Sequence, residues 1–162
     1  MQWLIKHGAD TSVRSNLDQS TLSKAIVVGS MEVVDFLLAK EDDVTRGDLL
    51  HCAAERTDQN EGAALALELL QRGADVNAHR YNNTVALRQR YLSKLETPLH
   101  TACFHKNAAV AKILLDHGAN LHSHMLQQFK EVGPTPFEVA RTSSSTELTD
   151  LLMAEDLRRA RM

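Results

Sequence analysis

The chain contains 162 residues with a mass of 18.0 kDa, enough for one domain with a sizeable core but hardly for two independent ones. With 43% apolar residues, 24% charged residues and a net charge of −3, the composition excludes a disordered chain, a fibrous chain and a surface that attracts nucleic acid or acidic lipid as a whole. We expect no signal peptide and no membrane segment, because the apolar run at residues 63–67 is far shorter than the roughly 20 residues of a span. Two cysteines, Cys52 and Cys103, suit a reducing compartment, so a cytoplasmic or nuclear protein is expected.

The first predicted element is the end of a helix within residues 1–10. Two apolar residues are followed by two variable ones and then by Gly8 and an Ala-Asp pair. The glycine is expected to take the left-handed conformation that ends a helix without a Cβ clash. The same phrase recurs at residues 69–75 and 114–120, with a degenerate copy at residues 37–43.

A second recurring phrase predicts where helices begin. Residues 97–102 read Thr-Pro-Leu-His-Thr-Ala, in which Thr97 caps a helix and Pro98 occupies its first turn. Weaker copies lie at residues 20–25, 48–53 and 135–140. Since the two phrases alternate along the chain, each unit is predicted to be a short helix, a turn and a second helix.

Together the two phrases resemble those of the ankyrin-repeat family, whose units follow one another about every 33 residues. The unit at 97–120 matches the family pattern nearly throughout, and the first three helix ends keep the family period. The resemblance implies an all-α solenoid of stacked helix-turn-helix units with β-hairpin-like fingers. On this interpretation residues 1–162 form a single ankyrin-repeat domain. It comprises a partial repeat (1–10), four helix pairs (20–43, 48–75, 97–120 and 135–156), a long inserted finger (76–96) and a C-terminal polar cap or tail (157–162).

Several positions depart from the family pattern. Glu41 and Asp156 stand where the family has its left-handed glycine, at a predicted cost of about 1 kcal/mol each, unless the helix simply continues at Asp156. Residues 56–62 are predicted to be a few extra residues between two helices, and residues 121–133 a second surface insertion. Such insertions are tolerated because each unit packs only on its neighbours.

The first ten residues supply only the end of a second helix, which contains Trp3, Leu4 and Ile5. An exposed edge of a repeat stack is an apolar surface that needs a polar cap. We therefore expect either that the chain is a fragment of a longer array or that this edge packs on further repeats or on another chain.

Eight histidines raise the question of a metal site. His51 and His100 occupy the histidine position of the repeat, where the resemblance implies a side chain tied to neighbouring backbone. His122 and His124 lack a paired cysteine set of the zinc-finger type. We therefore expect no metal.

Catalytic signatures are also missing from the sequence. Cys103 and His105 are close along one short helix, but their side chains point in different directions. The sequence contains neither a nucleophile elbow nor a phosphate-binding glycine loop. We therefore expect no enzyme, no cofactor and no small-molecule substrate.

In ankyrin-like proteins the partner usually meets a concave face made of finger tips and the exposed side of the first helices. The two residues after the alanine pair of each first helix map onto this face. They are Val27 and Val28, Glu55 and Arg56, Phe104 and His105, and Thr142 and Ser143. Val27, Val28 and Phe104 are apolar where a solvated face is often polar, so they are candidate anchors for a partner. The alternative is that they pack against the inserted loops.

The inserted finger 76–96 is basic and contains interleaved tyrosines. Its candidate contact residues are Tyr81, Arg88, Arg90 and Tyr91. Such a segment can touch phosphates or an acidic peptide. A short basic stretch is more often a solvated loop, and we favour that interpretation over a nucleic-acid contact.

The sequence thus predicts a noncatalytic protein–protein interaction module, an intracellular scaffold that binds a protein partner through its concave groove and finger tips. Three alternatives stay open: a regulatory or targeting segment of a larger protein, a nucleic-acid contact through the basic finger, and a truncated array with no independent function. The partner itself is not encoded in these patterns, because a fold does not fix a function.

Overall fold

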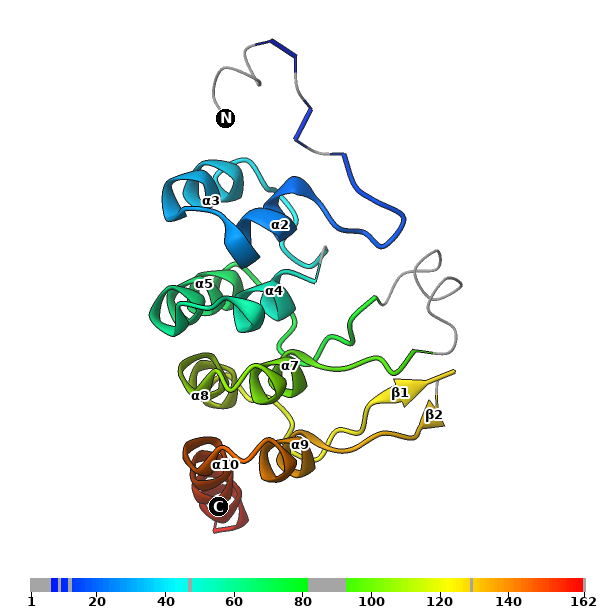
Figure 1. Ribbon diagram of the computed structural model, residues 1–162, viewed down its shortest axis with the longest axis vertical. Coiled ribbons are helices and arrows are strands. Elements are labelled where there is room, and N and C mark those ends of the chain that lie inside the picture. The colour runs from blue at the N-terminus through cyan, green and yellow to red at the C-terminus, as the bar shows by residue number, and fades with distance from the viewer. Residues whose placement is uncertain are drawn as a thin grey trace.

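The computed structural model describes residues 7, 8, 10, 11, 13–46, 48–81, 93–128 and 130–161. In these residues the chain is mostly helical, with eight helices and a short two-stranded sheet. The helices form four successive pairs (Figure 1). The pairs are Thr21–Val28 (α2) with Met31–Leu38 (α3), Leu49–Glu55 (α4) with Gln59–Gln71 (α5), Pro98–Phe104 (α7) with Ala108–Asp116 (α8), and Pro136–Thr142 (α9) with Thr146–Ala160 (α10).

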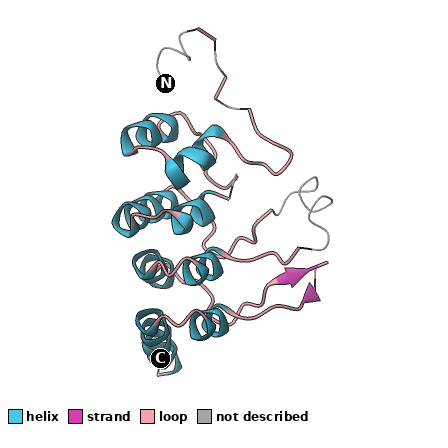
Figure 2. Ribbon diagram, in the orientation of Figure 1, coloured by secondary structure: helices cyan, strands magenta, loops and turns pink. Residues whose placement is uncertain are grey.

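The first helices of the pairs, here called the inner helices, form one row. Within it α2 packs on α4, α4 on α7 and α7 on α9, while on the other side α5 packs on α8 and α8 on α10. The long loops project from the side of the inner helices, and the two strands lie in one of these loops (Figure 2). Alanine and aliphatic side chains fill the core between the rows, among them Ile26, Ala53, Leu69, Leu114 and Leu152. Each pair therefore buries its apolar faces against its neighbours.

Three inner helices begin with reciprocal capping bonds. In each, the cap side chain and the side chain three residues later bond to one another's backbone N–H, which satisfies donors that the helix leaves free. The pairs are Ser20 with Ser23, Thr97 with His100 and Thr135 with Glu138. α4 begins differently, because its cap residue Asp48 has a left-handed φ of 54° and makes no side-chain capping bond.

The helix ends confirm part of the glycine prediction. Gly73 and Gly118, which follow α5 and α8, have φ values of 95° and 87°, as a helix-ending glycine requires, and Gly8 has a φ of 91°. The prediction of left-handed strain at Glu41 is wrong, because Glu41 does not have a positive φ. At Asp156 the helix continues, since α10 runs to Ala160.

Residues 59–62 belong to a helix and not to a connection, so the prediction that residues 56–62 are extra residues between helices is wrong for this part. α5 begins at Gln59, capped by the Asp58 side chain. Gly62 lies inside α5, where a Cβ atom would be 2.7 Å from the carbonyl oxygen of Ala53. The glycine thus lets α5 approach α4 closely.

The two insertions lie side by side. Leu126–Gln127 (β1) pairs antiparallel with Lys130–Glu131 (β2). The Leu95 N–H donates to the Leu126 carbonyl at 2.6 Å, and the Leu126 N–H returns a bond of 3.0 Å. Several residues named in the sequence analysis lie outside the described residues, namely Trp3, Leu4, Ile5, Arg88, Arg90 and Tyr91.

Two buried histidines connect successive pairs. His100 accepts the Thr97 N–H at Nδ1 (3.2 Å), so its Nε2–H donates to the Pro134 carbonyl at 3.0 Å. His51 Nε2 lies 3.0 Å from the Glu96 carbonyl oxygen. Burial lowers the pKa of His51 to about 3 and that of His100 to about 4, so both rings are neutral at physiological pH. Both side chains are tied to backbone, as the resemblance implies.

Candidate partner-binding site

The ends of the inner helices carry side chains of contrasting character at corresponding positions. Val28 is 67% exposed at the end of α2, and Phe104 is 50% exposed at the end of α7. The helix between them, α4, ends on Glu55. The helix beyond α7, α9, ends on Thr142. Two apolar side chains therefore face solvent along this row, separated by a charged one.

An open hollow of about 340 Å³, called here the valine hollow, lies beside the end of α2. Half-buried Val27 and exposed Val28 form one wall, and the start of α5 forms another. Exposed apolar surface next to a concavity is where a partner side chain gains most from leaving water. The hollow is lined by Val27, Val28, Gly29, Arg56, Thr57, Asp58 and Glu61.

Arg56 is buried beneath the valine hollow and does not extend into solvent. Its guanidinium donates to the carbonyl oxygens of Ile26 (2.5 Å) and Gly29 (2.8 Å), which end α2, and to the Glu61 carboxylate (2.8 Å). These bonds satisfy helix-end carbonyls that otherwise lack partners. Arg56 therefore shapes the hollow, in contrast to the exposed contact that its sequence position suggested.

Glu55 is also engaged within the chain. Its carboxylate forms an ion pair with Arg80, which also bonds to Glu96 at 3.0 Å. Arg80 thereby fastens the start of the inserted finger onto α4. A second hollow of about 140 Å³ opens here and shares Val27 with the first, so the two hollows adjoin; its other lining residues are Gln19, Ser23, Lys24, Cys52, Glu55 and Arg80.

Tyr81 is the last described residue before the gap in the inserted finger. Its backbone N–H donates to both carboxylate oxygens of Asp48, at 3.1 and 3.2 Å. Burial raises the pKa of Asp48 to about 6, and the bond from Tyr81 opposes this rise. The left-handed φ of Asp48 thus directs its carboxylate to the finger and away from its own helix. Tyr81 itself is half-buried.

The other end of the row is more polar. His105 and Lys106 are exposed beside Phe104. The Ser143 hydroxyl donates to the Ala140 carbonyl at 2.8 Å, and the Thr142 hydroxyl also bonds within its own helix. The candidate anchors are thus concentrated at Val27, Val28 and Phe104.

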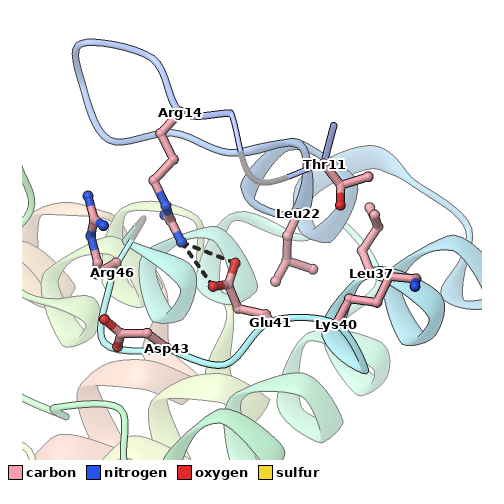
Figure 3. Close-up of a pocket in the computed structure, with 8 residues that line it drawn as sticks. All are labelled: Thr11, Arg14, Leu22, Leu37, Lys40, Glu41, Asp43 and Arg46. Carbon is pink, nitrogen blue, oxygen red and sulfur yellow. Dashed lines mark hydrogen bonds and ion pairs between the residues drawn. The ribbon is translucent and has the colours of Figure 1, made fainter. Parts of the chain in front are cut away.

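A third hollow, of about 300 Å³, lies between the segment that precedes α2 and the loop that joins α3 to α4 (Figure 3). Leu22 and Leu37 line its apolar side, while Arg14 and Glu41 face each other across a pair of 3.1 Å hydrogen bonds. Arg46 pairs with Asp18 at 2.7 Å. Because basic and acidic groups neutralise one another here, the hollow has no marked preference for a charged ligand.

Residues 94–124 match the family model described as Ankyrin repeat. The match covers the helix pair α7 and α8, the Thr97 capping box and Gly118. This segment is an ankyrin repeat, and its match supports the assignment of the chain to the ankyrin-repeat family. No curated protein gives a significant match to the chain.

Ankyrin repeats are generally noncatalytic protein–protein interaction modules. Burial raises the pKa of the Cys52 and Cys103 thiols to about 12, which keeps both protonated and unreactive at neutral pH. Within the described residues no three His, Cys, Asp or Glu side chains are placed to hold a metal ion. None of the helices in that part of the chain is long and apolar enough to cross a membrane.

Sequence reasoning missed the charged residues around the valine hollow and the second hollow. Asp58 caps α5 by accepting the N–H groups of Asn60 and Glu61 at 3.0 Å. An Asp followed three residues later by Glu is a helix-start signal that was available in the sequence. The pairing of Arg80 with Glu55 and Glu96 had no such signal, because the contact joins an insertion to a helix.

Proposed function

We propose that the protein is a noncatalytic protein-binding module in which the four helix pairs form a continuous ankyrin solenoid, and that a segment of a partner protein binds across the ends of the inner helices. The observation that carries this proposal is the exposed Val28 at the edge of a 340 Å³ hollow. Action in the cytoplasm or nucleus, as a scaffold, belongs to the same proposal and rests on the two free, buried cysteines.

The valine hollow is held in shape before any partner arrives. Arg56 bonds the two carbonyls that end α2 and the carboxylate of Glu61 on α5. A site whose walls are already fixed loses little conformational entropy on binding. An apolar side chain that enters the hollow therefore keeps most of the free energy gained by leaving water, about 1.5–3 kcal/mol for a fully buried Leu or Phe.

The charges around the two hollows favour one kind of partner segment. Asp58 and Glu61 place two negative charges beside the valine hollow, and Arg56 compensates one of them through its ion pair with Glu61. Lys24 is exposed at the second hollow and has no ion pair among the described residues. The proposed ligand is an extended segment with an apolar side chain for the valine hollow, a basic residue facing Asp58 and Glu61, and an acidic residue facing Lys24.

Phe104 supplies a second, separate anchor. The ion pair of Glu55 with Arg80 lies at the intervening inner helix, so the apolar surface is not continuous from α2 to α7. A partner that uses both anchors has to cross this polar section. We expect Phe104 to add affinity for a longer segment and to be dispensable for a short one.

The nucleic-acid alternative has little support from the described part of the finger, because Arg80 is neutralised by Glu55 and Glu96. Contacts through Arg88, Arg90 and Tyr91 remain a prediction. Retention on heparin that falls with salt and is lost in the Arg88→Glu/Arg90→Glu variant would support them. The roles of a targeting segment in a larger protein or a truncated array also stay open as alternatives.

The proposal is tested by selecting binders from a displayed library of random peptides of about 12 residues, long enough to cross two inner helices. Enriched peptides are expected to share an apolar residue with a basic neighbour. Val28→Lys should weaken their binding at least about tenfold, which is the loss of roughly 1.4 kcal/mol. Val13→Lys is the matched control, because Val13 is exposed to a similar extent (64%) but does not line either hollow.

Urea denaturation of both variants checks that each stays folded. The proposal is refuted if no peptide is enriched over repeated rounds. It is also refuted if the enriched peptides bind the Val28→Lys variant as tightly as the Val13→Lys control.

A further inference from the structure

The last described helix, α10, exposes apolar side chains on its solvent side. Met153 is 47% exposed and Leu157 is 56% exposed, and the two lie one helical turn apart. The C-terminal segment that the sequence suggested as a polar cap therefore contains an exposed leucine. The opposite side of α10 buries Leu148 and Leu152 in the core.

Met153 and Leu157 occupy stacking positions of the repeat. When Gly118 is placed in register with Asp156, Met153 corresponds to Leu115 and Leu157 to Ala119. Leu115 is 3% exposed and Ala119 is fully buried. α10 packs on α8, and its Arg159 donates to the carbonyls of Leu115 (3.0 Å) and Ala119 (2.9 Å). The same positions on α10 face outward without a covering helix among the described residues.

Two opposite charges lie at the two ends of this apolar stripe. Asp150 lies about one turn before Met153, and Arg161 lies about one turn after Leu157. Both side chains are exposed, and neither has an ion pair or a side-chain hydrogen bond in the described part of the chain. The surface formed by these four residues, called here the α10 stripe, is acidic at one end, apolar in the middle and basic at the other end.

We propose that two copies of the chain associate through their last described helices, with the two α10 stripes packed antiparallel around a two-fold axis. An axis between Met153 and Leu157 sets Met153 of each copy against Leu157 of the other. It also brings Asp150 of each copy near Arg161 of the other. The stripe is thus complementary to itself, which is the condition for a two-fold interface.

The interface is small, and the dimer is correspondingly weak. α10 has 15 residues and is about 22 Å long. Two such helices bury less than the roughly 1,200 Å² that stable complexes require. We expect a dimer that forms in the micromolar range or above and dissociates on dilution.

Sedimentation equilibrium of the full chain tests the proposal. Between about 10 and 500 µM the average mass should rise from 18.0 kDa toward twice that value. The Met153→Lys/Leu157→Lys variant should stay monomeric over the same range. Val132→Lys is the matched control, because Val132 is 48% exposed but lies after β2, and it should dimerise like the unmodified chain.

A charge exchange tests the antiparallel arrangement. Asp150→Arg alone and Arg161→Asp alone should each weaken self-association about fivefold or more, because like charges then face each other at both ends of the stripe. Mixing these two variants should restore association, since every new charge meets its opposite across the two-fold axis. In a parallel arrangement Asp150 faces Asp150 and Arg161 faces Arg161 already in the unmodified chain, so neither single variant would weaken self-association.

A chain that stays monomeric at the highest concentration overturns the proposal. So does a dimer that survives Met153→Lys/Leu157→Lys. A dimer that is lost in this variant but shows no rescue on mixing the charge variants overturns the antiparallel geometry. Leu157→Ala, which removes the apolar contact without adding charge, should weaken the dimer with unchanged urea stability and so guards against misfolding of the lysine variants.

Discussion

The junction of the first two helix pairs and the junction of the last two are built from different chemistry. At the first junction the loops are connected by the ion pairs of Arg14 with Glu41 and of Arg46 with Asp18, beside a hollow of about 300 Å³. At the last junction His100 is fully buried and bonds the Pro134 carbonyl. The residue at the histidine position of the first unit is Ser23, whose side chain is shorter.

The difference teaches how unequal the connections between successive helix pairs of one chain can be. Ion pairs beside an open hollow stay close to water and salt, so each contributes little. A neutral histidine in a dry core fixes two backbone groups that have no alternative partner, so its removal is costly. Since the stability of an array depends on the interfaces between neighbours, the first pair should open before the others.

The largest effect is expected for His100→Ala. The change leaves the Thr97 N–H and the Pro134 carbonyl without their partner and opens a cavity, at a cost of about 3 kcal/mol. Arg14→Ala, the comparison at the first junction, should cost about 1 kcal/mol, because water in the adjacent hollow can solvate Glu41. Urea denaturation followed by circular dichroism measures both free energies of unfolding.

Salt sharpens this comparison. In about 1 M NaCl the loss caused by Arg14→Ala should shrink, since the ion pair is screened. The loss caused by His100→Ala should stay the same. Equal losses in the two variants, or a salt effect on the histidine variant, would contradict the distinction between the two junctions.

The sequence predicted some of these helices and contacts but not others. The start phrase at Thr97 and the glycine at Gly118 predicted α7 and α8, because capping and left-handed glycine are local properties. The role of His100 followed from family resemblance. The ion pair of Arg14 with Glu41 was not predictable, since it joins residues in two loops whose paths depend on the packing of the helices between them.

In the candidate site too, some residue positions were predictable from the sequence and some side-chain contacts were not. The positions of Val28 and Phe104 at the ends of inner helices follow from the repeat register, although their exposure needed the structure. Arg56 was misjudged, because the register places it at the same site but cannot show that its guanidinium turns back to the carbonyls of Ile26 and Gly29. Long side chains have enough reach to make register a poor guide to where their charge lies.

Acid should weaken the histidine junctions selectively. The folded pKa values of about 3 for His51 and 4 for His100 lie below the unfolded value of 6.5. Unfolded chains therefore bind more protons below pH 6.5, so the stabilisation is present above that pH and is lost as the pH falls toward the folded pKa values. Asp48, with a folded pKa raised to about 6 from 3.8, acts in the opposite direction over this range.

Because two histidines oppose one carboxylate, the free energy of unfolding should fall by about 2 kcal/mol between pH 7 and pH 5. In the His51→Gln/His100→Gln variant these histidines no longer oppose the Asp48 contribution, so its stability should rise slightly over the same interval. Urea titrations at several pH values measure both slopes. Parallel slopes for the two proteins would show that these histidines do not control the acid sensitivity.

The smallest effects are expected at two helix ends, one that has the left-handed glycine of the family pattern (Gly73) and one that does not (Glu41). Gly73 has a φ of 95°, and apart from the two adjoining residues no heavy atom lies within 4 Å of where an alanine Cβ would stand. Gly73→Ala therefore isolates backbone strain and should cost about 1 kcal/mol. Glu41 stands at the corresponding position but does not have a positive φ, so Glu41→Gly relieves no strain, although it restores the family residue. It also removes the bond to Arg14 and should lower stability by about 0.5 kcal/mol at low salt. If Glu41→Gly instead raises stability in thermal denaturation, the end of α3 can adopt the regular glycine-type helix end. The ion pair of Arg14 with Glu41 would then not compensate for the missing glycine.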